Sequence, residues 1–172
     1  MKVIELPGDA LVVLVAPAGA GKSTFARQHF RPTEIVSSDR CRALVCDDEA
    51  NQHATPAAFE VFDAIIRGRM RMGRLAVADA TNLEAEPRRR MREMAREAGR
   101  PVVCLVLDVP RERTEAQNFA RRRRVPPHVL TLHFQRLAET LLALPTEGFD
   151  AVHQVRPWEG VRFTRASRVL RG

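Results

Sequence analysis

The feature that most constrains this chain is a stretch of small residues between an apolar run and the polar start of a helix. Residues 10–15 are all apolar, as a buried strand requires, and the chain then reads Ala16-Pro17-Ala18-Gly19-Ala20-Gly21-Lys22-Ser23-Thr24. A strand, a tight loop and Gly-Lys-Ser opening a helix form a phosphate-binding loop, whose backbone N–H groups surround phosphate oxygens. The alternative is a glycine-rich turn that only joins a strand to a helix.

Lysine is otherwise almost absent from the chain. Of 28 basic residues only Lys2 and Lys22 are lysine, so positive charge alone would not require one here. In a phosphate-binding loop the ammonium reaches the outermost phosphate oxygens, and the Ser23 hydroxyl takes a position on Mg²⁺. Ala16 replaces the first glycine of the usual motif, which is tolerated where that residue keeps a negative φ. The predicted ATP-binding residues of the loop are Ala18, Gly19, Ala20, Gly21, Lys22, Ser23 and Thr24.

Length and composition indicate a single domain over residues 1–172. The apolar runs are six or seven residues long, far short of the roughly 20 that cross a membrane, and the N-terminus lacks a signal-peptide layout. Three cysteines without metal-ligand spacing argue against a disulfide framework. We therefore expect a cytoplasmic protein without a membrane partner. The net charge of +7 suggests an acidic partner such as nucleic acid, unless it reflects biased residue usage.

Apolar runs and helical periodicity alternate along the chain. We expect strands over 10–15, 34–36, 75–78, 101–107 and 149–155, the last followed by an Arg-rich tail. Helices are expected over 22–30 and 84–98, between Pro56 and Gly73, after Pro110, and after Pro127 to about residue 144. This order predicts an α/β fold of the P-loop NTPase and kinase type. In this fold a parallel sheet has helices on both faces, and the chain also carries an Arg-rich lid. The active site is expected at the carboxyl ends of the strands.

The loop after the second strand carries Asp39 and Arg42. If Asp39 starts a helix, Arg42 lies three residues on and shares its face. A carboxylate and a guanidinium that point together toward the phosphates suit a phosphoryl acceptor site. Asp39 would take the hydroxyl proton and Arg42 would hold an anionic group of the acceptor. The alternative is that Asp39 only caps the helix.

The loop after the third strand reads Asp79-Ala80-Thr81-Asn82. An Asp at this strand end resembles a Walker B acid, which holds Mg²⁺ through water. Thr81 and Asn82 are neutral donors suited to a phosphate or ribose of the acceptor, or either one caps the next helix.

A run of four arginines, Arg121–Arg124, follows the fourth strand by one helix and precedes Pro126-Pro127. In P-loop kinases a mobile lid at this place brings arginines to the transferring phosphoryl group. We expect the lid over about 117–128. The alternative is a solvated face, as is usual for runs of like charge.

Several of these blocks resemble the kinase domain of bacterial polynucleotide kinase-phosphatases and, more distantly, the phage polynucleotide kinases. The resemblance covers nearly the whole chain. Its blocks include Gly21-Lys22-Ser23-Thr24-Phe25-Ala26, Ser37-Ser38-Asp39, Cys41-Arg42, Asp79-Ala80-Thr81-Asn82 and Glu147-Gly148-Phe149. It implies transfer of the γ-phosphate of ATP, with Mg²⁺, to a 5′-OH end of RNA or DNA in end healing or repair. It also implies phosphatase and ligase domains as partners, if the chain is a domain of a larger protein and not a stand-alone kinase.

Residue roles carried over from this family match the loops above. Lys22 and Ser23 would bind donor phosphates and metal, and Asp39 would be the general base. Arg42 and Thr81 would hold the phosphate next to the 5′-OH. Arg121 and Arg124 would be lid arginines that contact ATP, and Gln117 of the same lid would also contact ATP. The family places an arginine where this chain has Gln117, so charge at the phosphoryl group is expected from the arginine run.

Two further readings remain. A small-metabolite kinase of the shikimate, gluconate or adenylylsulfate type, or a zeta-toxin-like kinase, would share the loop, base and lid. A non-catalytic nucleic-acid-binding module could use the arginines alone. Leu130, on the helix after the lid, is a candidate apolar contact for the terminal base, or else a core leucine.

Overall fold

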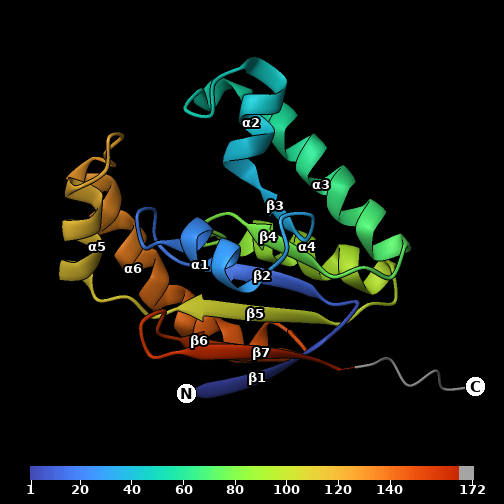
Figure 1. Ribbon diagram of the computed structural model, residues 1–172. Coiled ribbons are helices and arrows are strands. Elements are labelled where there is room, and N and C mark those ends of the chain that lie inside the picture. The colour runs from blue at the N-terminus through green and yellow to red at the C-terminus, as the bar shows by residue number, and fades with distance from the viewer. Residues whose placement is uncertain (167–172) are drawn as a thin grey trace, which may run out of the picture.

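Five parallel strands form the central sheet of the computed structural model, which describes residues 1–166. Their order across the sheet is β3-β4-β2-β5-β6 (Figure 1). The bounds are β2 Leu11–Val15, β3 Ile35–Ser37, β4 Ala76–Asp79, β5 Val102–Leu107 and β6 Ala151–Val155. The glycine-rich loop thus follows the central strand, where loops from both sides of the sheet can reach it. The predicted parallel α/β fold is confirmed.

Six helices connect the strands, close to their expected positions. They are α1 Lys22–His29, α2 Ser38–Cys46, α3 Thr55–Arg71, α4 Ala85–Glu97, α5 Arg111–Phe119 and α6 Pro127–Ala143, with short 3-10 turns η1 Gln52–Ala54 and η2 Leu144–Thr146. Sequence signals mark their ends. Helix α3 has Pro56 in its first turn, and Gly73, at φ 63°, closes its last turn with a bond to Met70 O.

The three central strands, β4, β2 and β5, are buried on both faces, because layers cover them on either side. In β2 all five residues are buried, with Leu11, Val13 and Val15 in one apolar cluster and Val12 and Leu14 in the other. Helices α3, α4 and α6 contribute Phe62, Met91 and Leu137, among other residues, to the first cluster. The second is closed by α1 and by a small additional sheet. Strands β2 and β5 therefore read as continuous apolar runs, whereas the edge strand β6 includes His153 and Gln154.

The small sheet was not expected from the sequence. It pairs β1 (Lys2–Pro7) with β7 (Val161–Ala166) in parallel, and it packs Ile4, Leu6 and Val161 against α1. Part of the predicted Arg-rich tail is thus a strand, while residues 167–172 of that tail lie outside the described residues. Figure 1 shows this pair along the lower side of the sheet.

Candidate active site

The loop between β2 and α1 has the backbone of an anion cradle. Gly19 and Gly21 lie at φ 81° and 87°, a left-handed region that side chains disfavour. Ala16 is fully buried and donates its N–H to Thr81 O at 3.2 Å, which joins the start of the loop to the turn after β4. Figure 1 shows α1 between α2 and the α5–α6 pair, which stands beyond the arrowhead of β5.

Lys22 folds back over this loop. Its Nζ donates to Pro17 O at 2.9 Å and to Ala16 O at 3.3 Å. Burial lowers the pKa of this ammonium to about 8, although the charges of Asp79 and Asp39 oppose the shift. A triphosphate would replace these carbonyls with stronger acceptors and restore the charge.

Ser23 and Asp79 bring two oxygen donors together at the loop. The Ser23 Oγ donates to Asp79 Oδ2 at 2.8 Å, and Asp79 ends β4 with 4% of its surface exposed. Burial raises the pKa of the Asp79 carboxyl, against the hydrogen bond from Ser23 and the charge of Lys22. Mg²⁺ prefers oxygen ligands and keeps several waters, so a hydroxyl and a strand-end carboxylate in contact fit that ion.

Asp39 and Arg42 form an ion pair on the first two turns of α2. Arg42 Nη1 lies 2.7 Å from Asp39 Oδ1, and Arg42 Nε donates to Thr55 Oγ1 at 3.2 Å. Ser37 caps the helix by accepting the N–H of Arg40, so the alternative that Asp39 serves only as the cap is wrong. The Asp39 side chain is 54% exposed, whereas that of Arg42 is 11% exposed. The Asp39 carboxylate is therefore accessible, and it lies beside the Arg42 guanidinium, which its contacts with Asp39 and Thr55 hold in place.

Asn82 differs from its predicted role in contacting the acceptor. Its side chain is buried and its Nδ2 donates to three backbone carbonyls, those of Leu14 at 2.7 Å and of Ala78 and Ala80 at 3.3 Å. With φ 49° it holds a turn that ties the end of β4 to β2. Neither Thr81 nor Asn82 caps α4, whose N-cap is Glu84. Thr81 remains half-buried at the loop and accepts from Ala16.

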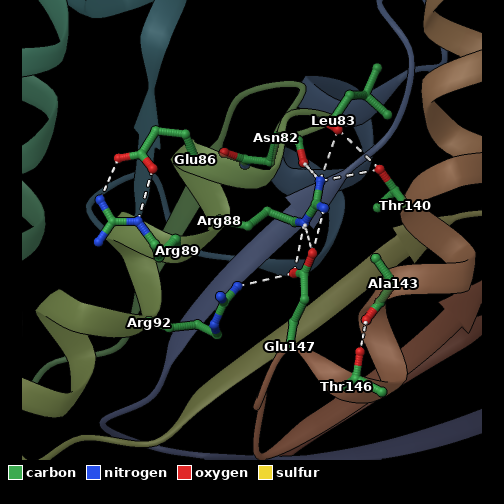
Figure 2. A network of polar contacts seen from close by, with 10 residues as sticks. All are labelled: Asn82, Leu83, Glu86, Arg88, Arg89, Arg92, Thr140, Ala143, Thr146 and Glu147. Atoms are coloured by element: carbon green, nitrogen blue, oxygen red, sulfur yellow. Dashed lines mark hydrogen bonds and ion pairs between the residues drawn. The ribbon is translucent and has the colours of Figure 1, made fainter.

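A buried arginine that sequence reasoning missed fixes the same turn. Arg88 is 2% exposed, and its Nη1 donates to Asn82 O, Leu83 O and Thr140 Oγ1 at 2.8–3.1 Å. Its Nε and Nη2 bind the Glu147 carboxylate, which Arg92 also contacts (Figure 2). Burial opposes ionisation of Glu147, but the bonds and charges of the two arginines outweigh it and lower the pKa of its carboxyl. The network connects α4, the loop after β4 and α6.

The last turn of α5 and the segment after it lie over the glycine-rich loop through Asn118 and Arg121, respectively. A Cβ built on Gly19 would meet Asn118 Cβ at 3.6 Å and Arg121 Nη1 at 3.7 Å, and Arg121 contributes to the lowered pKa of Lys22. The Asn118 amide bonds the N–H and the carbonyl of Val125, both at 2.8 Å. Asn118 therefore closes the connection between α5 and α6 as one turn. Asn118 lies within the lid expected over about 117–128, but the sequence predicted no role for it.

Other predicted lid residues lie elsewhere. The Arg124 guanidinium stacks 4.1 Å from the Phe119 ring centroid, so a cation–π contact and not the loop holds it. Gln117 is exposed on α5, and so are Arg122 and Arg123 on the connection. The structure thus brings Arg121, but not Arg124 or Gln117, to the glycine-rich loop.

Helix α6 contributes a further residue that the sequence did not indicate. His133 Nδ1 accepts the N–H of Ala18 at 3.1 Å, inside the glycine-rich loop. Burial, and next the charge of Lys22, lowers the pKa of this imidazole. Leu130, one turn earlier, is 3% exposed, so the structure contradicts the predicted base contact and places it as a core leucine.

The sheet order, the phosphate-binding loop after the central strand and the arginine over that loop define a P-loop fold of the kinase type. The chain belongs to the AAA domain family, whose sequence pattern matches residues 11–143. No curated protein matches it significantly. Within residues 1–166, none of the helices has the length and apolarity needed to cross a bilayer.

Solved structures share this fold at low sequence identity. A chain from the PezAT chromosomal toxin–antitoxin system of Streptococcus pneumoniae matches with a TM-score of 0.70 and 14% identity, over 92% of this chain and 71% of that one. A proposed kinase from Chloroflexus aurantiacus matches with TM-score 0.56 and 13% identity, over 88% and 86%. A chain of the Pnkp1/Rnl/Hen1 complex matches with TM-score 0.54 and 16% identity, over 95% and 80%. At these identities the likeness shows the fold alone.

Proposed function

We propose that this protein is an ATP-dependent kinase of 5′-OH nucleic-acid ends. The observation that carries the proposal is the Asp39–Arg42 pair, an exposed carboxylate 2.7 Å from a largely buried guanidinium. Asp39 acts electrostatically on both Lys22 and Asp79, so it lies near the donor site. A base beside an anion-binding arginine suits an acceptor whose hydroxyl neighbours a phosphate.

In the proposed reaction Asp39 takes the proton of the acceptor hydroxyl. A bond forms between that oxygen and the γ-phosphorus of ATP, while the bond from the γ-phosphorus to the bridging oxygen breaks and ADP leaves. Lys22 and Arg121 offset charge on the phosphates, and Arg42 orients the acceptor through its phosphate. Ser23 and Asp79 would hold Mg²⁺, which supplies further charge neutralisation when bound.

Three further features support a polynucleotide as the acceptor. The chain carries a net charge of +7, which favours an anionic partner. Its Ser-Ser-Asp-x-Cys-Arg and Asp-Ala-Thr-Asn blocks resemble those of polynucleotide kinases, with Asn82 in a structural place. A chain of the Pnkp1/Rnl/Hen1 complex has the same fold. Phosphatase or ligase partners belong to the same proposal.

The test is transfer of labelled γ-phosphate from ATP to a panel of acceptors. We expect label on a 5′-OH oligonucleotide and none on the same oligonucleotide that already carries a 5′-phosphate, on shikimate or on gluconate. Lys22→Ala should abolish transfer, whereas Lys2→Ala, which changes the other lysine, should preserve it. Preferential transfer to a small metabolite would replace the proposal with a metabolite kinase. Oligonucleotide binding without any transfer would indicate a binding module.

A further inference from the structure

A second concentration of positive charge lies at the opposite end of the sheet from the glycine-rich loop. A cavity of about 380 Å³ is lined by Gly8, Arg31, Thr33, Glu34, Arg69, Arg74, Leu75 and Arg165. Glu34 and Leu75 directly precede β3 and β4, and Gly8 lies in the short connection from β1 to β2, so the cavity faces the amino ends of β2, β3 and β4. In Figure 1 this is the right-hand side, where α3 ends and the β1–β2 connection turns.

The cavity is lined by four arginines and by a single carboxylate, that of Glu34. The Glu34 Oε2 accepts the backbone N–H of Arg31 at 2.9 Å and lies 3.1 Å from Arg165 Nη2. Arg69 donates its Nε to Leu75 O at 2.8 Å, which uses one of its five N–H groups. Glu34 therefore neutralises at most one of the four positive charges.

The other two guanidiniums have no partner within the part of the chain that the structure describes. Over residues 1–166 the structure gives neither the Arg31 nor the Arg74 side chain a hydrogen bond or an ion pair, and both residues are exposed at the cavity. Burial lowers the pKa of the Arg69 guanidinium; the charge of Glu34 opposes this shift and the charge of Arg74 adds to it. Like charges held together without counter-charges cost stability unless an anion compensates for them.

The character of the cavity narrows the class of ligand. Most small-molecule sites are lined mainly by apolar and aromatic groups. This one presents four guanidinium groups, the Glu34 carboxylate, the threonine Thr33 and one apolar side chain, Leu75. Guanidiniums bind phosphate oxygens through paired N–H groups, which makes several arginines around one hollow a phosphate-type site.

We propose that this cavity is a second anion site, separate from the glycine-rich loop, which binds a phosphate-bearing ligand through Arg31, Arg69, Arg74 and Arg165. The phosphate comes either from a free polyphosphate or nucleotide or from the backbone of a nucleic acid. The proposal does not depend on the kinase activity, since no residue of the cavity belongs to the catalytic loops.

The experiment measures pyrophosphate binding to Lys22→Ala protein by titration calorimetry at low ionic strength, because this background removes the phosphate-binding lysine of the loop. We expect measurable binding, weakened at least about tenfold in Lys22→Ala protein that also carries Arg31→Ser and Arg74→Ser. Neither arginine side chain has a partner among residues 1–166, so the fold should persist, which circular dichroism checks.

A matched control separates a built site from general charge. The control carries Arg71→Ser and Arg96→Ser, which remove two exposed arginines outside the cavity; Arg71 lies on α3, as Arg69 of the cavity does. Its affinity for pyrophosphate should stay within about twofold of that of Lys22→Ala protein. Competition by a 5′-phosphorylated oligonucleotide identifies a nucleic-acid backbone as the source, and competition by ATP alone identifies a free nucleotide. Absence of binding to Lys22→Ala protein, or equal weakening by both double variants, would overturn the proposal.

Discussion

The contacts of Arg42 distinguish its expected role in acceptor binding from the roles of the other arginines. It is largely buried, pairs with Asp39 and is held by Thr55, so it sits in one orientation before any acceptor arrives. A guanidinium that is already held in its binding orientation contributes most to affinity when the acceptor carries a negative charge that it can pair with.

We therefore expect Arg42→Ala to raise the KM for a 5′-OH oligonucleotide far more than the KM for ATP. Most of that penalty should vanish for an acceptor that lacks the phosphate next to its 5′-OH, since the partner charge is then already absent. Steady-state kinetics on the two acceptors checks this. Equal penalties on both would place the Arg42 contact elsewhere.

Lys22 predicts a proton linkage on ATP binding. Its pKa of about 8 in the free protein means that part of the population is neutral at alkaline pH, whereas phosphate oxygens favour the charged ammonium. We expect ATP binding to take up few protons near pH 7 and close to one near pH 9. Titration calorimetry in buffers of different ionisation enthalpy measures the uptake. Lys22→Arg should show none, because guanidinium stays protonated.

At the scale of elements, the connection between α5 and α6 works as a unit around Asn118. The two bonds from this amide to Val125 shape the turn, and only Arg121 of its four arginines lies against the glycine-rich loop. The arginine run is thus divided by geometry, although its members are identical in sequence.

This division predicts unequal effects within the run. Arg121→Ala should lower kcat by about a thousandfold, the scale for an arginine that stabilises a transferring phosphoryl group. Arg122→Ala and Arg123→Ala, which change exposed neighbours, should stay within about twofold of the wild type. The comparison uses saturating ATP. Three indistinguishable variants would show the run to be a solvated face.

The buried network of Arg88 stabilises the turn after β4. Breaking a buried ion pair leaves an uncompensated charge, so Arg88→Ala should lower the free energy of unfolding by about 3 kcal/mol. Arg89 lies beside Arg88 on α4 but pairs with Glu86 and Glu93 at the surface. Arg89→Ala should therefore leave the free energy of unfolding nearly unchanged. Urea denaturation measures both.

The same network carries a pH signature. Because the folded pKa of Glu147 is lowered, its contribution is complete above the ordinary glutamate pKa and is lost as pH falls through the lowered value. The difference between wild type and Arg88→Ala should therefore shrink in acid. An unchanged difference at low pH would exclude Glu147 as the partner that matters.

At the scale of the whole molecule, local patterns predicted the elements that build the catalytic face. The apolar run, glycines and Gly-Lys-Ser lie within 15 residues, so β2, the loop and α1 could be read directly. The β1–β7 sheet could not, because its pairing joins Lys2 to Val161 and leaves no short-range signal. Exposed residues, several of them charged, alternate with buried ones in these two strands, so their sequence resembles that of an ordinary tail.

Side-chain placement was less predictable than the fold. His133 and Asn118 reach the glycine-rich loop from about a hundred residues away, and only the packing of α5 and α6 brings them there. Arg88 looks like its neighbours in sequence and differs only in burial. Asn82 carries the donors expected of a ligand contact, yet backbone carbonyls use its amide.

The most direct test of the central claim is the turnover of Asp39→Asn protein with saturating ATP and a 5′-OH oligonucleotide. If Asp39 takes the acceptor proton, turnover should fall by about a hundredfold or more, while ATP affinity and the melting temperature stay close to those of the wild type. Wild-type turnover with a lowered melting temperature would contradict the account, since Asp39 would then only stabilise α2.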